Sequence, residues 1–439
     1  MIKESHRTWT DLFAAPLKKA DQTIASLVTE ERLRNEVTVN LIASESYCPR
    51  ATLDAEATIL VNKNATGYPG RRNVAGCEIV DQIERLAQDR ANRLFGAEHA
   101  NVQALASTIG NIAVLRALLR PGDRILALGE EAGGHHSHGA SCHLSGQDYE
   151  VAFFGPDESR EDIDLAEVEH RAASFHPRLI IAGSTAYPRA LDFRGLHAIA
   201  QRVGAYLFAD IAHVAGLVAA GLHDNPAPYA DVVTTSTHKT LCGPRTGGLI
   251  LSKKRYAEAI DGALFPGLQG APGVHIIAAR AVLFELVAGE AFRKLMEAVV
   301  RNAQALARSL LDHGVPLYLG GTDTHMVVVD LRARELDPIR IERRLSRHGV
   351  LSNRVCLKRR DGDRSTVGLR LGTTAMTIRG MREAEFVRLG ELISSLLDDG
   401  ESETIDARVA HEVADMAAQF PLPPGPGCPK GGHSNGTPQ

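Results

Sequence analysis

A lone lysine lies in a run of small hydroxyl side chains, and this run is the strongest candidate for chemistry in the sequence. It reads Thr234-Thr235-Ser236-Thr237-His238-Lys239-Thr240 and follows the apolar pair Val232-Val233. A strand that ends in hydroxyls, an imidazole and an amine packs poorly. A desolvated lysine amine there can form a Schiff base with an aldehyde cofactor. A single lysine is more often a solvated surface group, so its role depends on a second segment.

The second segment, residues 206–213, predicts a buried strand that delivers Asp210 and His213. A lysine for the imine and an aspartate for the pyridinium nitrogen are what pyridoxal phosphate requires from a protein. Together, Lys239 and Asp210 predict pyridoxal 5'-phosphate as the cofactor.

Ser107 and Thr108 precede a predicted helix over residues 109–119. Free backbone N–H groups and two hydroxyls at a helix start suit a phosphate monoester, although an ordinary serine or threonine N-cap explains this segment equally well.

Three histidines, His135, His136 and His138, follow a predicted strand. No cysteine or carboxylate spacing accompanies them, so we expect no metal site. Arg370 lies among apolar residues in the middle of a predicted strand, where a charge requires a carboxylate partner, either a substrate or an internal salt bridge.

Composition excludes several classes of protein. The chain has 439 residues, 44% of them hydrophobic and 23% charged, with a formal charge of -4. No basic stripe predicts nucleic-acid binding. The six cysteines show no CxxC spacing, and we find neither a secretory signal nor a membrane-spanning run. We therefore expect a cytoplasmic protein with reduced thiols.

Apolar runs that alternate with amphipathic helices predict an α/β fold with a mainly parallel central sheet and a smaller C-terminal α+β domain. The predicted strands and helices are 81–95 (helix), 124–128, 179–182, 205–208, 248–251, 326–329 (strands) and 339–348 (helix). The predicted domains are a helical N-terminal arm (1–62), a large cofactor-binding domain (63–318), a small domain (319–420) and a disordered tail (421–439).

The sequence resembles the serine hydroxymethyltransferase family of fold-type I pyridoxal-phosphate enzymes over residues 35–415. The motifs that carry the resemblance are Leu41-Ile42-Ala43-Ser44-Glu45-Ser46, Gly67-Tyr68-Pro69-Gly70-Arg71-Arg72, Gly76-Cys77-Glu78, residues 210–217 and His238-Lys239-Thr240.

The resemblance implies a role for each matching residue. Lys239 would carry the Schiff base, Asp210 would bind the pyridinium nitrogen, and His135 would stack on the ring. His213, with Thr185, would border the phenolic oxygen, and His238 would also contact the cofactor. Ser107 and Thr108 would bind the phosphate, which Gln269 and Gly270 would reach from the neighbouring subunit. Ser44 and Arg370 would hold the substrate carboxylate. The family implies a homodimer, which can pair into a tetramer.

The sequence departs from the family where folate would bind. The family motif tyrosine-alanine-glutamate is Asn64-Ala65-Thr66 here, and a threonine cannot replace a titrating carboxylate. Asn73-Val74 replaces a tyrosine pair. Glu131 and His136 stand in a loop that usually offers leucines to the folate ring, where a charge would be costly without a partner. Neutral drift explains one such change, but it hardly explains five that cluster on one ligand.

From these departures we predict an L-threonine transaldolase that releases acetaldehyde and adds the retained glycine unit to a second aldehyde without folate. His135 or His136 is the candidate for moving the β-hydroxyl proton. The alternatives are a tetrahydrofolate-dependent serine or α-methylserine hydroxymethyltransferase, a simple threonine aldolase, and a silent cofactor-binding subunit.

Overall fold

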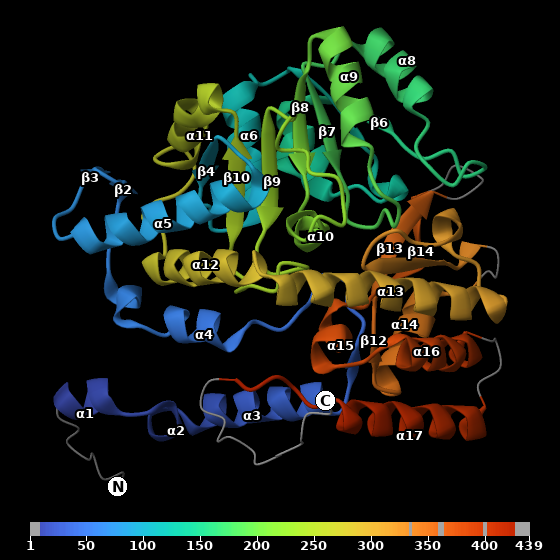
Figure 1. Cartoon of the computed structure of the whole chain (residues 1–439). Coiled ribbons are helices and arrows are strands. Elements are labelled where there is room, and N and C mark those ends of the chain that lie inside the picture. Colours follow the sequence, from blue (N-terminus) through green and yellow to red (C-terminus); the bar gives the residue numbers. More distant parts are fainter. Residues whose placement is uncertain (1–8, 333–335, 359–363, 398–401, 426–439) are drawn as a thin grey trace, which may run out of the picture.

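The computed structural model describes residues 9–332, 336–358, 364–397 and 402–425. A seven-stranded sheet forms the larger of two domains, with strand order β4-β10-β9-β8-β7-β5-β6 (Figure 1). Its strands are β4 (His99–Asn101), β5 (Arg124–Leu128), β6 (Glu150–Phe154), β7 (Leu179–Gly183), β8 (Tyr206–Asp210), β9 (Val232–Ser236) and β10 (Gly248–Ser252). The five strands β5 to β9 are parallel, whereas β10 runs antiparallel to both β9 and β4. The prediction of a mainly parallel sheet is confirmed.

The central strands are buried on both faces, which explains their uninterrupted apolar runs. Successive residues of β5 alternate between two core clusters, with Ile125 in one and Leu126 in the other. The helices that cover the two faces and the sheet ends are α5 (Glu78–Phe95), α6 (Ser107–Leu118), α7 (Leu144–Asp148), α8 (Leu165–Phe175), α9 (Phe193–Val203), α10 (Ala215–Ala219), α11 (Ala257–Leu264) and α12 (Val274–Val287). The predicted elements of this domain all appear, with ends shifted by a few residues.

The smaller domain is built on a three-stranded antiparallel sheet, order β11-β14-β13. Its strands are β11 (Met326–Asp330), β13 (Asn353–Lys358) and β14 (Arg364–Gly372), and its helices are α14 (Pro338–Arg347), α15 (Thr374–Arg379), α16 (Glu383–Leu396) and α17 (Glu403–Gln419). A short strand near the N-terminus, β1 (Val39–Asn40), pairs in parallel with β12 (Val350–Leu351). The segment that leads to Ser44 therefore packs with the C-terminal core.

The long helix α13 (Glu290–Asp312) connects the two domains. Met296 and Val299 near its start belong to the core of the large domain, while Leu306 and Leu310 near its end belong to the core of the small one. Figure 1 shows α13 running between the large sheet above and the helices of the small domain below.

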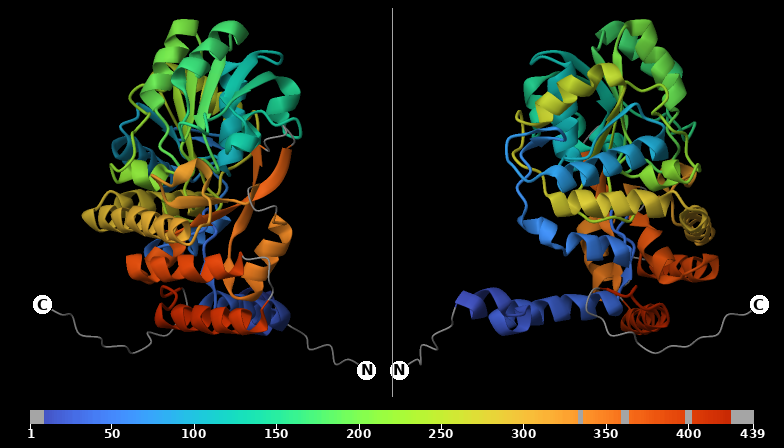
Figure 2. Two further views of the ribbon diagram at one scale, coloured as in Figure 1. Left: turned by 90° about the vertical axis from the view of Figure 1, so that its right-hand side faces the viewer. Right: turned by 60° about the vertical axis from the view of Figure 1, so that its left-hand side comes forward.

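The N-terminal arm consists of α1 (Trp9–Ala14), α2 (Leu17–Ala20) and α3 (Gln22–Glu36). It runs out from the body of the chain at the level of α17 (Figures 1 and 2). No residue of α2 or α3 is buried within the chain. Beyond the arm lie α4 (Arg50–Glu56) and the hairpin of β2 (Gly67–Tyr68) and β3 (Arg71–Arg72).

Two further predictions concern the chain ends and membranes. The predicted tail falls mostly on residues 426–439, which lie outside the described residues. Its first part, Pro421–Gly425, has no helix or strand. Within the described ranges, no helix combines the length and the apolar character needed to cross a bilayer.

Candidate active site

Lys239 and Asp210 meet because β8 and β9 are parallel neighbours. Asp210 ends β8 and pairs in register with Thr234 of β9, and Lys239 follows β9 by three residues. The carboxyl ends of parallel strands in an open α/β sheet are where ligands bind. Burial lowers the pKa of Lys239 to about 8, with Arg370 and Arg245 acting in the same direction and Asp210 opposing them. A minor but appreciable fraction of this amine is therefore neutral near physiological pH and able to act as a nucleophile.

Three donors hold the Asp210 carboxylate. His138 Nε2 lies 3.0 Å and Asn111 Nδ2 2.8 Å from Oδ2, and the Ala212 N–H donates to Oδ1 at 3.0 Å. Burial alone would raise the pKa of Asp210, but His138 and then Lys239 hold it well below its ordinary value. A permanently ionised carboxylate can keep a pyridine nitrogen protonated. We did not predict a role for His138 or Asn111, since their spacing from Asp210 in sequence gives no signal of contact.

The candidate phosphate site lies at the start of α6. The residue before this helix is Ala106, and no side chain caps it. The Ser107 Oγ is buried and has no hydrogen-bond partner in the described chain. The ordinary N-cap that we left open is therefore absent, and an orphan hydroxyl beside uncapped N–H groups fits a phosphate.

His135 lies beside Asp210 with a ring that stays neutral. Its Nδ1 lies 2.7 Å from the Ser137 hydroxyl, and burial, then His138, lower its pKa to about 3. Such a weak base is poorly matched to proton removal at neutral pH, which argues against His135 as the proton-moving group. His136 is exposed and lies over His135 with ring centroids 3.9 Å apart.

Arg370 lies within a strand, as predicted, two residues before the end of β14, and it is buried. It donates to the carbonyl and hydroxyl of Thr185, the latter at 2.9 Å, and to Asn353 Oδ1 at 3.1 Å. In the described part of the chain it makes no ion pair, so the internal salt bridge that we left open is absent. Burial lowers the pKa of Arg370 to about 10, which leaves it cationic and able to bind a carboxylate.

Two histidines lie against Arg370 and Lys239. His213 Nε2 is 3.2 Å from the Thr185 hydroxyl, and burial followed by Lys239 and Arg370 lowers its pKa well below the ordinary value. His238, next to Lys239, has a pKa lowered to about 4 by burial and then by that lysine. Ser46 donates to the His238 carbonyl at 2.8 Å, which ties the segment after Ser44 to the lysine loop.

Gln269 is hydrogen-bonded, within its own chain, to the segment just before the candidate phosphate site. Gln269 Nε2 donates to the Gln103 carbonyl at 2.8 Å, and its Oε1 accepts from the Leu105 N–H. Its reach into a neighbouring subunit stays a prediction. Thr66 donates to Asn64 Oδ1 at 2.6 Å, so neither side chain supplies a titrating group.

Glu131 lines a cavity of about 460 Å3 beside η2 (Glu130–Ala132), whereas His136 is not part of its wall. The other charged side chains of the wall are Asp157, Glu158, Asp164, Glu167 and Arg171.

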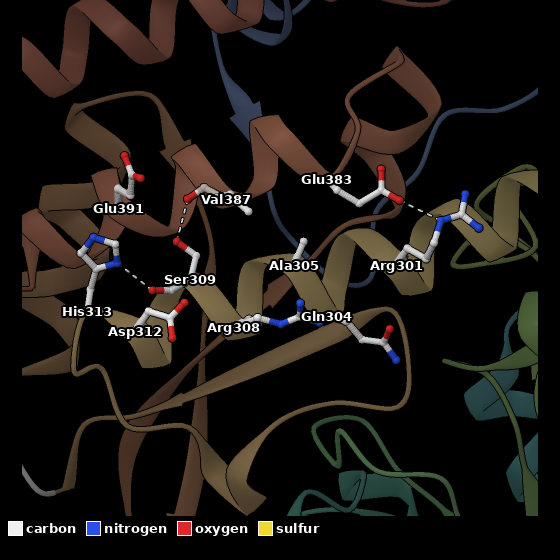
Figure 3. A pocket seen from close by; sticks show the side chains of 10 residues that line it. All are labelled: Arg301, Gln304, Ala305, Arg308, Ser309, Asp312, His313, Glu383, Val387 and Glu391. Atoms are coloured by element: carbon white, nitrogen blue, oxygen red, sulfur yellow. Dashed lines mark hydrogen bonds and ion pairs between the residues drawn. The ribbon is translucent and has the colours of Figure 1, made fainter.

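A different groove lies on the outside of the small domain, between α13 and α16 (Figure 3). Among the described residues, no group of histidine, cysteine and carboxylate side chains is arranged to hold a metal.

A partly neutral lysine and an ionised aspartate at the strand ends of the large sheet, with a buried arginine that makes no ion pair within the described residues, define a fold-type I pyridoxal-phosphate enzyme. The family model described as serine hydroxymethyltransferase matches residues 17–393, and the chain belongs to this family. A serine hydroxymethyltransferase of Myxococcus xanthus is 44% identical over 407 residues, which cover 92% of this chain and 97% of the relative. One from Acidobacterium capsulatum is 43% identical over 414 residues, covering 94% and 97%.

Proposed function

We propose that this chain breaks and forms the Cα–Cβ bond of β-hydroxy-α-amino acids. The observation that carries the proposal is the buried Arg370 guanidinium, which has no anionic partner in the described chain and lies close to Lys239 and His213. Arg370, with Ser44, would bind the substrate carboxylate. Asp210 would hold the proton on the ring nitrogen of the cofactor, which when bound supplies the electron sink for bond cleavage.

The names of the relatives favour hydroxymethyl transfer as the use of this chemistry. Both are serine hydroxymethyltransferases and match almost the whole chain. On this candidate, serine is cleaved to glycine and its hydroxymethyl carbon passes to tetrahydrofolate.

The second candidate is threonine transaldol exchange, and two observations favour it. The hydroxyl of Thr66 is hydrogen-bonded to Asn64 at the position where the family resemblance places an acid/base glutamate. Glu131 belongs to a cavity wall with five carboxylates and one guanidinium. By the family resemblance folate would need an apolar wall at Glu131, whereas a polar wall suits a polar aldehyde better.

One set of incubations separates these candidates. The purified protein with cofactor is given L-serine or L-threonine, with and without tetrahydrofolate and with a panel of aldehydes. Folate-dependent formation of glycine from serine supports hydroxymethyl transfer and rejects exchange. Acetaldehyde release from threonine with a new β-hydroxy amino acid supports exchange, whereas acetaldehyde release without a new product indicates a simple aldolase. No cleavage of either amino acid, with Lys239→Ala as the matched blank, would contradict the proposal as a whole.

A further inference from the structure

His325 is a fully buried histidine just before β11, outside the set of site residues predicted from the sequence. Its exposed fraction is 0%, and that of His213 is 2%. The two rings stack with centroids 5.6 Å apart and an angle of 20° between their planes. His325 Nε2 lies 3.2 Å from the Ala43 carbonyl oxygen and 3.5 Å from His213 Nδ1. One ring nitrogen thus contacts both the residue before Ser44 and the histidine beside Arg370.

The backbone keeps His325 in this place. The Thr373 N–H donates to the His325 carbonyl at 3.0 Å, directly after β14. Gly372 N–H donates to the Leu41 carbonyl at 2.7 Å, and a Cβ on Gly372 would lie 2.3 Å from Ala43 Cα. The end of the Arg370 strand and the segment of Ser44 therefore meet at His325.

Both rings are neutral, so each carries one proton. Burial, and then the charge of Arg370, lowers the pKa of His325 to about 3, and His213 is shifted in the same direction. A neutral imidazole has one donor and one acceptor nitrogen. The favoured tautomers are those that leave the fewest buried N–H groups without a hydrogen-bond partner.

If His325 carries its proton on Nε2, it donates to the Ala43 carbonyl and faces the lone pair of His213 Nδ1. Its own Nδ1, which is buried without a partner, is then only an unused acceptor. If the proton is on Nδ1 instead, a buried N–H is orphaned and the Ala43 carbonyl loses this donor. An orphaned buried N–H is the rarer and costlier arrangement.

The first assignment places the proton of His213 on Nε2, where it donates to the Thr185 hydroxyl at 3.2 Å. That hydroxyl also accepts from Arg370 Nη1, whose second hydrogen is directed at the Thr185 carbonyl. Arg370 Nη1 also lies 3.4 Å from His213 Nε2. Because both hydrogens of Nη1 are directed at Thr185, this contact does not require His213 Nε2 to be an acceptor, and an Nε2–H on His213 can donate to the Thr185 hydroxyl.

We propose that His325 is a positioning residue, whose Nε2–H fixes His213 with its Nε2–H toward the active site and holds the Ala43 carbonyl beside Ser44. This role rests on the proposed function only in that Arg370 and Ser44 face the substrate. It applies to hydroxymethyl transfer and to aldol exchange alike.

The test compares His325→Gln and His325→Leu in the holoenzyme. A glutamine amide can place an N–H near the Nε2 position, whereas leucine fills the space without a donor. Met326→Leu, in the next position and also buried, is the control. The readouts are the absorption band of the bound cofactor with and without glycine, kcat and KM for the amino acid cleaved, and the thermal unfolding midpoint.

We expect His325→Leu to shift the cofactor band and to lower kcat by about tenfold or more, with a much smaller change in KM. His325→Gln should restore the cofactor band, and its kcat should lie within about threefold of that of the control. An unchanged band and kcat in His325→Leu overturn the proposal. So does a glutamine variant as impaired as leucine at an unchanged unfolding midpoint. If the leucine variant does not fold, a tenfold lower kcat of His325→Gln relative to the control overturns the proposal.

The spectral response to glycine separates this inference from the proposed function. If neither serine nor threonine is cleaved by the wild type, the cofactor band of the His325 variants still reports on His213.

Discussion

At the scale of single residues, a buried lysine that faces two guanidinium groups and one carboxylate loses its proton more easily than a lysine in water. Because only the neutral amine attacks an aldehyde, cofactor capture by the apoprotein should accelerate with pH around a midpoint of about 8, the lowered pKa of Lys239. A stopped-flow series that follows the cofactor absorption band measures this midpoint. Arg245→Gln removes a neighbouring cation, so it should move the midpoint upward. A midpoint near the ordinary lysine value of about 10.4 in the wild type would contradict the assignment.

A second prediction at this scale concerns Thr66, whose hydroxyl cannot titrate. If the second candidate function is right, Thr66→Glu restores a carboxylate where folate-linked transfer requires one. A positioned acid/base group contributes about 10² to 10⁴ in rate. We therefore expect serine cleavage that depends on tetrahydrofolate to rise by at least about tenfold. Thr66→Gln has similar size without titration and should give no gain. Fast folate-dependent turnover of serine by the wild type would remove the basis of this prediction.

The sequence was sufficient to predict that Lys239 and Asp210 lie together, and insufficient to predict the groups that hold Asp210. Lys239 and Asp210 could be predicted because each follows an apolar strand, and adjacent parallel strands bring their ends together. The partners of Asp210 lie 72 and 99 residues away, at His138 and Asn111. Such contacts depend on how loops fold back over the sheet, which no local pattern records.

At the scale of elements, α13 and α16 pack tightly at a glycine. A Cβ on Gly390 would lie 2.5 Å from Ser309 Oγ, whose hydroxyl already donates to the Val387 carbonyl at 2.7 Å (Figure 3). Gly390→Ala should therefore lower the thermal unfolding midpoint, with a cost of about 1–3 kcal/mol for overpacking.

The matched control for this prediction is Gly262→Ala in α11, where a Cβ would meet no atom within 4 Å. This change should be neutral or stabilise the chain by up to about 1 kcal/mol, since alanine favours a helix over glycine. If the Gly390→Ala variant and the wild type have the same thermal unfolding midpoint, the two helices can move apart without a loss of stability.

Elements were predictable where burial is complete and poorly predictable where pairing is short. Strands such as β5 and β7 show as continuous apolar runs because both faces are covered. For the two-residue strand β1, the pairing with β12 could not be predicted from the sequence. In the arm, the apolar spacing correctly predicted a helix. It did not indicate that Leu27 would be 53% exposed in the single chain.

At the scale of the whole molecule, the arm leaves apolar side chains uncovered. Ile24, Leu27 and Val28 lie on one stripe of α3 and are all exposed, and such stripes mark interfaces. We expect a homodimer in which a second copy covers this stripe. Leu27→Glu combined with Val28→Glu should shift sedimentation toward the mass of one chain, whereas Gln22→Glu on another face of α3 should not. A variant that keeps the wild-type mass would place the interface elsewhere.

A shared site would explain why Gly270 lies in open space within its own chain, where a Cβ meets no atom within 4 Å. Gly270→Asp should fold normally, yet it should weaken cofactor binding by at least about tenfold if this residue faces the phosphate of the neighbouring subunit, since like charges repel. In a mixture with Lys239→Ala, each hybrid dimer would then contain one site with neither change. Random mixing of two individually inactive variants should restore about a quarter of the sites. Activity and cofactor absorbance that do not recover on mixing would show that each chain binds its cofactor alone.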